Sequence, residues 1–92
     1  MTASNIQLVS AIFANDASKI KVLRAQGVDV NEYGFFNISP LLRAAMYGKP
    51  EALIALLECG ADRAARDNQG RTALELAQKY NHPRIIEILS KC

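Results

Sequence analysis

The sequence predicts an all-α fold in which three helix-turn-helix repeats, joined by hairpin-like fingers, stack side by side as a solenoid. Two observations carry this prediction. Residues of the same kind recur at a fixed offset of 33, as when Gly27 is followed by Gly60 and Pro50 by Pro83. Between these positions, apolar residues recur at the spacing of an amphipathic helix. Such a period is typical of repeat proteins, in which each unit packs against its neighbours.

Apolar columns at this offset predict the inward side of each helix. They are Leu8, Leu41 and Leu74; Ala11, Ala44 and Ala77; Ile20, Leu53 and Ile86; and Leu23, Leu56 and Leu89. The offset makes residues 1–92 a single domain with repeats at about 4–33, 34–66 and 67–92. Polar residues replace apolar ones at both ends, with Lys19 and Arg24 in the first repeat and Glu75 and Ser90 in the last. The outer repeats are therefore expected to act as caps.

Helix boundaries follow from capping and breaking residues. Ser4 with Gln7 and Thr72 with Glu75 have the spacing of a capping box, and Ser39 can cap a helix that begins with a proline. We predict helices over about residues 5–14, 17–26, 40–47, 50–60, 73–80 and from 83 onward. Glycines at 27 and 60 stand where a left-handed residue ends a helix.

Two fingers, over residues 28–38 and 61–71, connect the repeats. In the first finger, Gly34 can take positive φ, and Asn37 tolerates that conformation better than most residues do. Asp29 and Asp62 recur at the finger starts, where a carboxylate typically accepts hydrogen bonds from nearby backbone N–H groups.

These residues resemble the ankyrin repeat. Residues 39–42 (Ser-Pro-Leu-Leu) and 72–75 (Thr-Ala-Leu-Glu) stand where that family writes Thr-Pro-Leu-His, and residues 60–62 read Gly-Ala-Asp as the family does. Residues 67–72 follow the family's turn nearly letter for letter. The departures are Leu42 and Glu75 in place of the histidine, and Asn37 in place of the turn glycine. The resemblance covers about residues 6–92 and implies a protein-interaction module.

Composition and motifs argue against several classes of function. The net charge of +2 is too small to indicate a nucleic acid or a membrane as the target. The longest apolar run, residues 52–57, is too short to cross a bilayer, and residues 1–4 lack a signal-peptide pattern, so we expect a cytoplasmic protein. Cys59 and Cys92 fall in equivalent places of stacked repeats, about 10 Å apart, and are expected to be free thiols.

No motif in the sequence predicts an enzyme, a cofactor or a metal. His82 is the single histidine, and two distant cysteines cannot complete a zinc site with it. The resemblance places His82 in an interhelix turn, where we expect it to form a structural hydrogen bond. No glycine-rich phosphate loop is present.

The resemblance implies that a partner protein binds the fingertips and the first helix of each repeat. The predicted partner-binding residues are Tyr33, Phe35, Phe36, Ile38, Met46, Tyr47, Arg66, Asn68, Gln69, Arg71, Lys79 and Tyr80. Phe13 can extend this surface from the first repeat. The aromatic residues of the first finger stand where the family is usually polar; they either contact the partner or fold back over the first repeat. Ile54 stands where the family usually has an outward-facing charged residue. It therefore allows a second contact on the convex side of the stack, or a dimer.

Three functions are compatible with the sequence. The first is a non-catalytic protein-binding module, either an adaptor or a stoichiometric inhibitor, whose partner offers an acidic and apolar surface. The acidic part would face Arg63, Arg66 and Arg71, with Arg43 and Lys79 joining from the helices. The second is a weak binder of nucleic acid or another acidic ligand through the same arginines. The third is a purely structural spacer.

Overall fold

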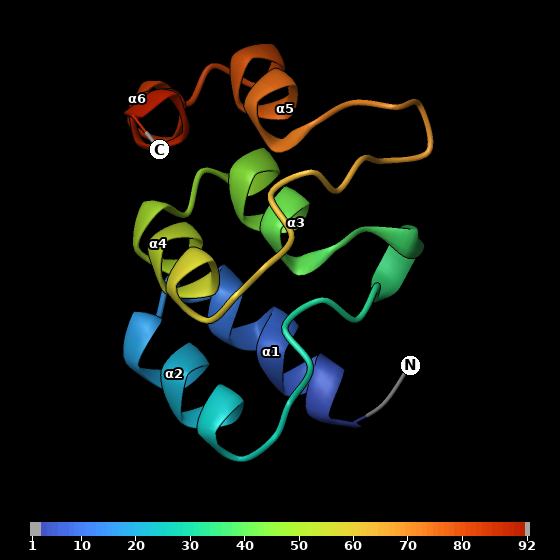
Figure 1. Ribbon diagram of the computed structural model, residues 1–92, viewed down its shortest axis with the longest axis vertical. Coiled ribbons are helices and arrows are strands. Elements are labelled where there is room, and N and C mark those ends of the chain that lie inside the picture. Colours follow the sequence, from blue (N-terminus) through green and yellow to red (C-terminus); the bar gives the residue numbers. More distant parts are fainter. Residues whose placement is uncertain (1–2, 92) are drawn as a thin grey trace.

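In the computed structural model, residues 3–91 form six α-helices, which pair as three antiparallel hairpins that stack in chain order (Figure 1). The structure describes residues 3–91, with only the backbone for Ala3, Ser4 and Phe35. The helices are α1 (Ala3–Phe13), α2 (Ala17–Ala25), α3 (Pro40–Tyr47), α4 (Pro50–Glu58), α5 (Ala73–Lys79) and α6 (Pro83–Lys91), and a short 3-10 helix, η1, covers Phe35–Asn37. No strand occurs within residues 3–91. The predicted all-α solenoid is confirmed.

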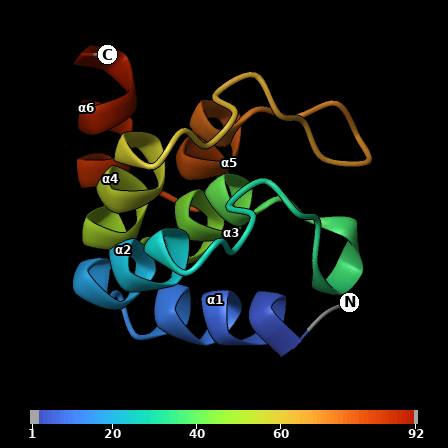
Figure 2. The same cartoon turned by 60° about the horizontal axis from the view of Figure 1, so that its bottom comes forward.

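The hairpins build two helical layers. The first helices, α1, α3 and α5, lie side by side in the inner layer, and α2, α4 and α6 form the outer layer (Figures 1 and 2). Both fingers leave the stack on the inner side, beyond the N-terminal ends of α3 and α5 (Figure 2). Within residues 3–91, no helix combines the length and the apolar character needed to cross a bilayer.

The predicted helix ends are largely confirmed. The Ser39 hydroxyl accepts a hydrogen bond from the Leu42 N–H at 3.2 Å, and Thr72 with Glu75 forms a reciprocal capping box. Gly27 and Gly60 are left-handed, with φ of +94° and +92°. At the chain start, α1 begins at Ala3, before the predicted residue 5, and the predicted cap from the Ser4 side chain lies outside the described residues, as does the thiol of Cys92. Cys59 is a free thiol, as predicted.

The core is a continuous layer between the hairpins. Small residues line the helix contacts: Ala11, Ala44 and Ala77 in the inner layer are at most 4% exposed. Larger aliphatic side chains fill the space between the layers and are almost fully buried, namely Leu8, Ile12, Ile20, Leu23, Leu41, Leu53, Leu56 and Leu76. The alanines allow close helix contact, and the aliphatic residues supply the buried apolar area that stabilises the stack.

Polar clamps at the interhelix turns fix the register of the hairpins. Between the first two, Asn15 Oδ1 accepts a hydrogen bond from the Ala52 N–H at 3.0 Å, and Asn15 Nδ2 donates to Glu51 Oε2 at 2.9 Å. Between the second and third, His82 Nε2 donates to the Met46 carbonyl at 2.9 Å. The expected structural hydrogen bond of His82 is thus confirmed.

The turn before α4 yields a stability prediction. Gly48 has φ of +69°, and a Cβ added to it would lie 2.5 Å from His82 Nδ1. We expect Gly48→Ala to lower the free energy of unfolding by about 2 kcal/mol, because it adds backbone strain and displaces the His82 clamp. Urea denaturation measures this loss. Gly27→Ala is the matched control, since Gly27 has a similar φ but open space around its Cβ position, and it should cost only about 1 kcal/mol. Equal losses would contradict the role given to His82.

Candidate binding surface at the fingertips

The two fingers lie against each other, and hydrogen bonds between them set their alignment. At the finger bases, Asn31 Nδ2 donates to the Gly60 carbonyl at 3.3 Å, and Asn31 Oδ1 accepts from the Asp62 N–H at 2.7 Å. At the tips, Asn37 Nδ2 donates to Asn68 Oδ1 at 3.3 Å. The fingers therefore present one joint surface.

The finger starts are shaped by the predicted carboxylates. Asp29 Oδ1 accepts a hydrogen bond from the Asn31 N–H at 2.8 Å, and Asp62 Oδ1 accepts one from the Ala64 N–H at 2.9 Å. Both side chains thus act within the backbone turn, as expected.

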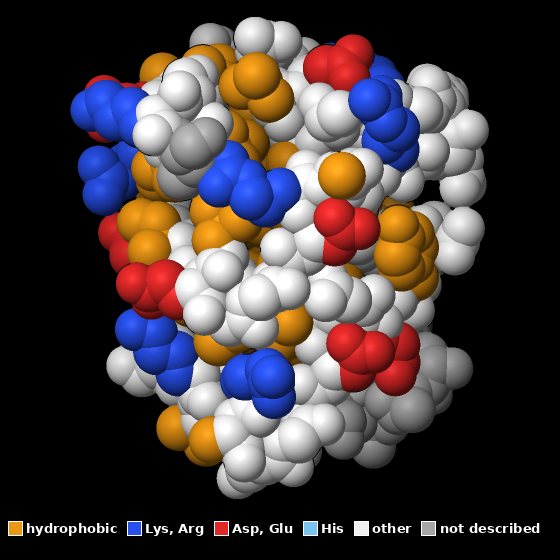
Figure 3. Space-filling model, viewed as in Figure 1, with side chains coloured by type: hydrophobic (Ala, Val, Ile, Leu, Met, Phe, Trp, Pro, Cys, Tyr) orange, Lys and Arg blue, Asp and Glu red, His pale blue; other side chains and the backbone are white. Residues whose placement is uncertain are grey.

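A small pocket opens between the fingertips. It has a volume of about 160 Å³ and is lined by Phe36, Ile38, Asp67, Asn68, Gln69 and Arg71, which we call the fingertip surface. Figure 3 shows exposed hydrophobic atoms over η1 at the right-hand edge of the molecule, beside this pocket. The structure thus brings together five of the predicted residues, and Asp67 is the member that sequence reasoning did not assign to the site.

Phe36 has the most unusual backbone of the fingertip surface. Its φ is +61° and its ψ is +20°, and its side chain is 81% exposed. Of the two residues that tolerate positive φ, Asn37 adopts it, at +55°, whereas Gly34 has a φ of −106°. The Asn37 N–H donates to the Gly34 carbonyl, so the centre of the turn lies beyond Gly34 and left-handed geometry falls on Phe36.

The structure describes two of the three aromatic side chains that were predicted to form a patch on the first finger. Phe36 does not fold back over the first repeat, and Tyr33 is 42% exposed. The side chain of Phe35 lies outside the described residues. Two exposed aromatic side chains on one finger form an apolar feature that is uncommon on a connecting loop.

The second finger is held by an internal ion pair. Asp67 Oδ1 accepts hydrogen bonds from the Arg71 and Gln69 N–H groups at 2.8 and 2.9 Å, and Oδ2 accepts from Arg71 Nε at 2.7 Å. These hydrogen bonds, with that of the Arg71 backbone the largest contribution, lower the pKa of the Asp67 carboxyl. Arg66 Nη1 donates to the Gly70 carbonyl at 2.7 Å.

These contacts change the expected basic surface. The Arg71 charge is compensated by Asp67, and Arg66 lies 4.0 Å from the Glu75 carboxylate. Arg43, expected to join the surface from its helix, is instead buried in α3 and only 2% exposed. Most of the positive charge near the pocket is thus paired or buried.

The remaining predicted residues form a second group, which we call the turn-end surface. It comprises Phe13, Met46, Tyr47, Lys79 and Tyr80, at the C-terminal ends of α1, α3 and α5. The Phe13 and Tyr47 rings stack with centroids 4.7 Å apart, and Lys79 Nζ lies 5.5 Å from the Tyr80 ring centroid. The eight residues of α3 span about 12 Å, and they separate this group from the fingers.

The described residues contain no group of three or more side chains suited to hold a metal ion. The pocket at the fingertips carries amide groups, apolar carbon and one ion pair. These groups suit the recognition of a macromolecular surface.

The Asp67 network makes stability depend on pH. Because the folded-state pKa of Asp67 lies below the unfolded value of about 4, its contribution is present above pH 4 and is lost as pH falls through the lowered pKa. We expect Asp67→Asn to lower stability at pH 7 and to flatten the decline of unfolding free energy between about pH 5 and pH 2. Urea titrations across this range measure both effects, and parallel pH curves for the two proteins would contradict this assignment.

Comparison with known proteins agrees with this architecture. The family model for ankyrin repeats, in three copies, matches residues 8–92. The chain is 45% identical over 65 residues to the ARF GTPase-activating protein Git of Drosophila melanogaster, covering 70% of this chain and 9% of that protein. It is 36% identical over 78 residues to Protein PhlB of Serratia liquefaciens, covering 84% of this chain and 34% of that protein.

A third relative is the E3 ubiquitin-protein ligase XBAT33 of Arabidopsis thaliana, which is 37% identical over 90 residues, covering 96% of this chain and 18% of that protein. The chain thus spans about a third or less of the length of these relatives. Ankyrin repeats are in general a non-catalytic fold for protein interaction. With its repeats, its helical hairpins and this match, the chain belongs to the ankyrin-repeat family.

Proposed function

We propose that this chain binds another protein through the fingertip surface, with Phe36 as the central contact. The observation that carries the proposal is the conformation of Phe36, which is left-handed and 81% exposed. A residue other than glycine in the left-handed region is destabilised by about 1–2 kcal/mol, and here no burial of the ring offsets that cost. Strain of this kind is typical of functional positions.

The surroundings of Phe36 support a protein as the ligand. Aromatic side chains contribute strongly to protein interfaces, because they bury a large area with few rotatable bonds. Beside Phe36, the amides of Asn68 and Gln69 can donate and accept hydrogen bonds at the rim of the pocket. An apolar centre with a polar rim is the usual composition of an interface.

The charges near the pocket favour a protein over a nucleic acid. Arg71 is paired with Asp67 at 2.7 Å, and Arg66 lies 4.0 Å from Glu75, so the second finger offers little uncompensated positive charge. Binding to a nucleic acid depends on cations that neutralise phosphates. Arg66 and Arg71 are therefore better explained as residues that hold the second finger in its conformation.

Two modes of action are compatible with such a contact. An adaptor recruits its partner to another protein. A stoichiometric inhibitor instead covers a functional site on the partner. An activity assay of the identified partner, with and without one equivalent of this chain, distinguishes the two modes.

Phe36→Asn tests the proposal without harming the fold. Asparagine tolerates left-handed geometry better than phenylalanine, so the variant should be as stable as the wild type or slightly more stable. Binding should fall by at least about tenfold, as expected for the loss of a central aromatic contact. The measurement is quantitative capture of proteins from a cell lysate on immobilised wild-type and variant chains, together with their urea denaturation curves.

The matched control is Tyr80→Ser, which removes an exposed aromatic side chain from the turn-end surface. It should retain the proteins that Phe36→Asn loses. The proposal fails if Phe36→Asn retains every specifically bound protein. It also fails if Tyr80→Ser alone removes them, because the contact then lies at the turn-end surface.

A further inference from the structure

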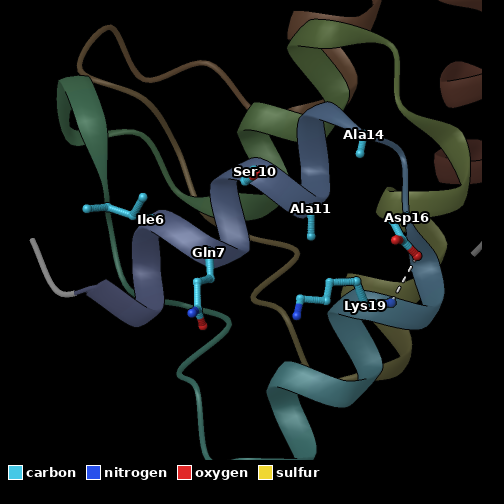
Figure 4. Close-up of a pocket in the computed structure, with 7 residues that line it drawn as sticks. All are labelled: Ile6, Gln7, Ser10, Ala11, Ala14, Asp16 and Lys19. Atoms are coloured by element: carbon cyan, nitrogen blue, oxygen red, sulfur yellow. Dashed lines mark hydrogen bonds between the residues drawn. The ribbon is translucent and has the colours of Figure 1, made fainter.

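A groove runs between α1 and α2 at the outer end of the first hairpin (Figure 4). Its volume is about 390 Å³. It is lined by Ile6, Gln7, Ser10, Ala11, Ala14, Asp16 and Lys19. In Figure 4, Gln7 and Ala11 of α1 point toward the long side chain of Lys19, whose amino end reaches toward Gln7. This groove is far larger than the fingertip pocket and lies on a different part of the fold.

The other two hairpins show what covers this face, because each position has an equivalent 33 residues further on. Ser10 and Lys19 are exposed, whereas Arg43 and Ala52, their equivalents in the second hairpin, are 2% and 0% exposed. The equivalents in the third hairpin, Leu76 and Ile85, are each 1% exposed. The second and third hairpins each have a preceding hairpin, and the first has none within residues 3–91.

Apolar side chains on this face follow the same pattern. Ile6 and Val22 are 49% and 48% exposed. Their equivalents in the second hairpin, Ser39 and Ala55, are 3% and 1% exposed. The face thus continues the established interface between hairpins, with an apolar middle that is left exposed by the part of the chain that the structure describes.

The opposite end of the stack has a different character. Four polar side chains, all exposed, stand there at positions where the second hairpin is apolar: Glu75, Gln78, Lys79 and Ser90. A second copy of this chain, stacked head to tail, would bury these groups against the α1–α2 groove. Burying a polar group without a partner costs free energy, so a second copy is a poor occupant.

The register between hairpins indicates which part of an occupant meets Lys19. The Ala52 N–H donates to Asn15 Oδ1 at 3.0 Å, so position 52 touches the interhelix turn of the preceding hairpin. Lys19 is the equivalent of Ala52 and would touch the turn of a hairpin docked in the same register. Its ammonium group forms no ion pair within residues 3–91, whereas Lys21 pairs with Glu58 at 3.1 Å.

We propose that the α1–α2 end face binds a helical hairpin of a partner protein, stacked in the register of the existing hairpins and carrying a carboxylate in its interhelix turn. The apolar middle of the face packs on the aliphatic side of that hairpin. Lys19 pairs with the carboxylate, and this pairing selects an acidic turn over a basic one. This contact is distinct from the fingertip surface and allows two proteins to bind at once.

A tandem chain provides the probe. A copy of residues 34–66, placed directly before residue 1, keeps the offset of 33 and offers a hairpin to the face at high effective concentration. We expect a single cooperative thermal transition, with Tm raised by at least about 5 °C over the original chain. Lys49→Asp within the added copy should raise Tm further, because Lys19 then meets a carboxylate. When Lys19→Glu is also present in the original segment, the tandem chain with Asp in the added copy should have a lower Tm than the one with Lys.

Val22→Glu serves as the matched control. In the original chain, where Val22 is half exposed, it should shift Tm by less than about 3 °C, while in the tandem chain it should remove the gain. Separate transitions for the added copy and the original segment would overturn the proposal, as would an equal effect of Val22→Glu in both chains. Sedimentation of the original chain should give a monomer, and a concentration-dependent dimer abolished by Val22→Glu would make a second copy the occupant instead.

Discussion

The close approach of neighbouring hairpins across small side chains is the constraint on which the rest of this structure depends. Ala11, Ala44 and Ala77 occupy one place in the three inner helices and are at most 4% exposed, so adjacent helices pack without bulky groups between them. A lone hairpin would leave this apolar face in water. Stacking therefore supplies most of the stability, and the polar clamps at Asn15 and His82 select one register rather than adding much free energy.

The geometry of the fingers depends on that register of the hairpins. Hydrogen bonds from Asn31 to the base of the second finger and from Asn37 to its tip can form only if the hairpins keep their spacing. A rigid scaffold of this kind can hold a side chain in a costly conformation, because the surrounding contacts over-determine the backbone. Phe36 is such a side chain, and the binding role proposed for its exposed ring depends on the stack that holds this backbone in place.

Sequence reasoning predicted what depends on local chemistry and on the repeat period. The three hairpins, the cap at Ser39 and the left-handed Gly27 follow from residue type and spacing alone. Tertiary contacts decided the rest. The hydrogen bonds of the first finger place positive φ at Phe36 and not at Gly34, and Arg43 is buried within the stack. The predicted site divides into the fingertip surface and the turn-end surface. This division could not be predicted, because it depends on the lengths and positions of the helices, which the repeat period does not give.

The central claim is that a partner protein lies against the ring of Phe36, and site-specific photo-crosslinking tests it most directly. A photoreactive benzoylphenylalanine would replace Phe36 in one chain and Ile54, on the outer helix α4, in another. Irradiation in a cell lysate should give a discrete crosslinked product from position 36 and none from position 54. A product from position 54 alone would place the partner on the convex side and contradict the account.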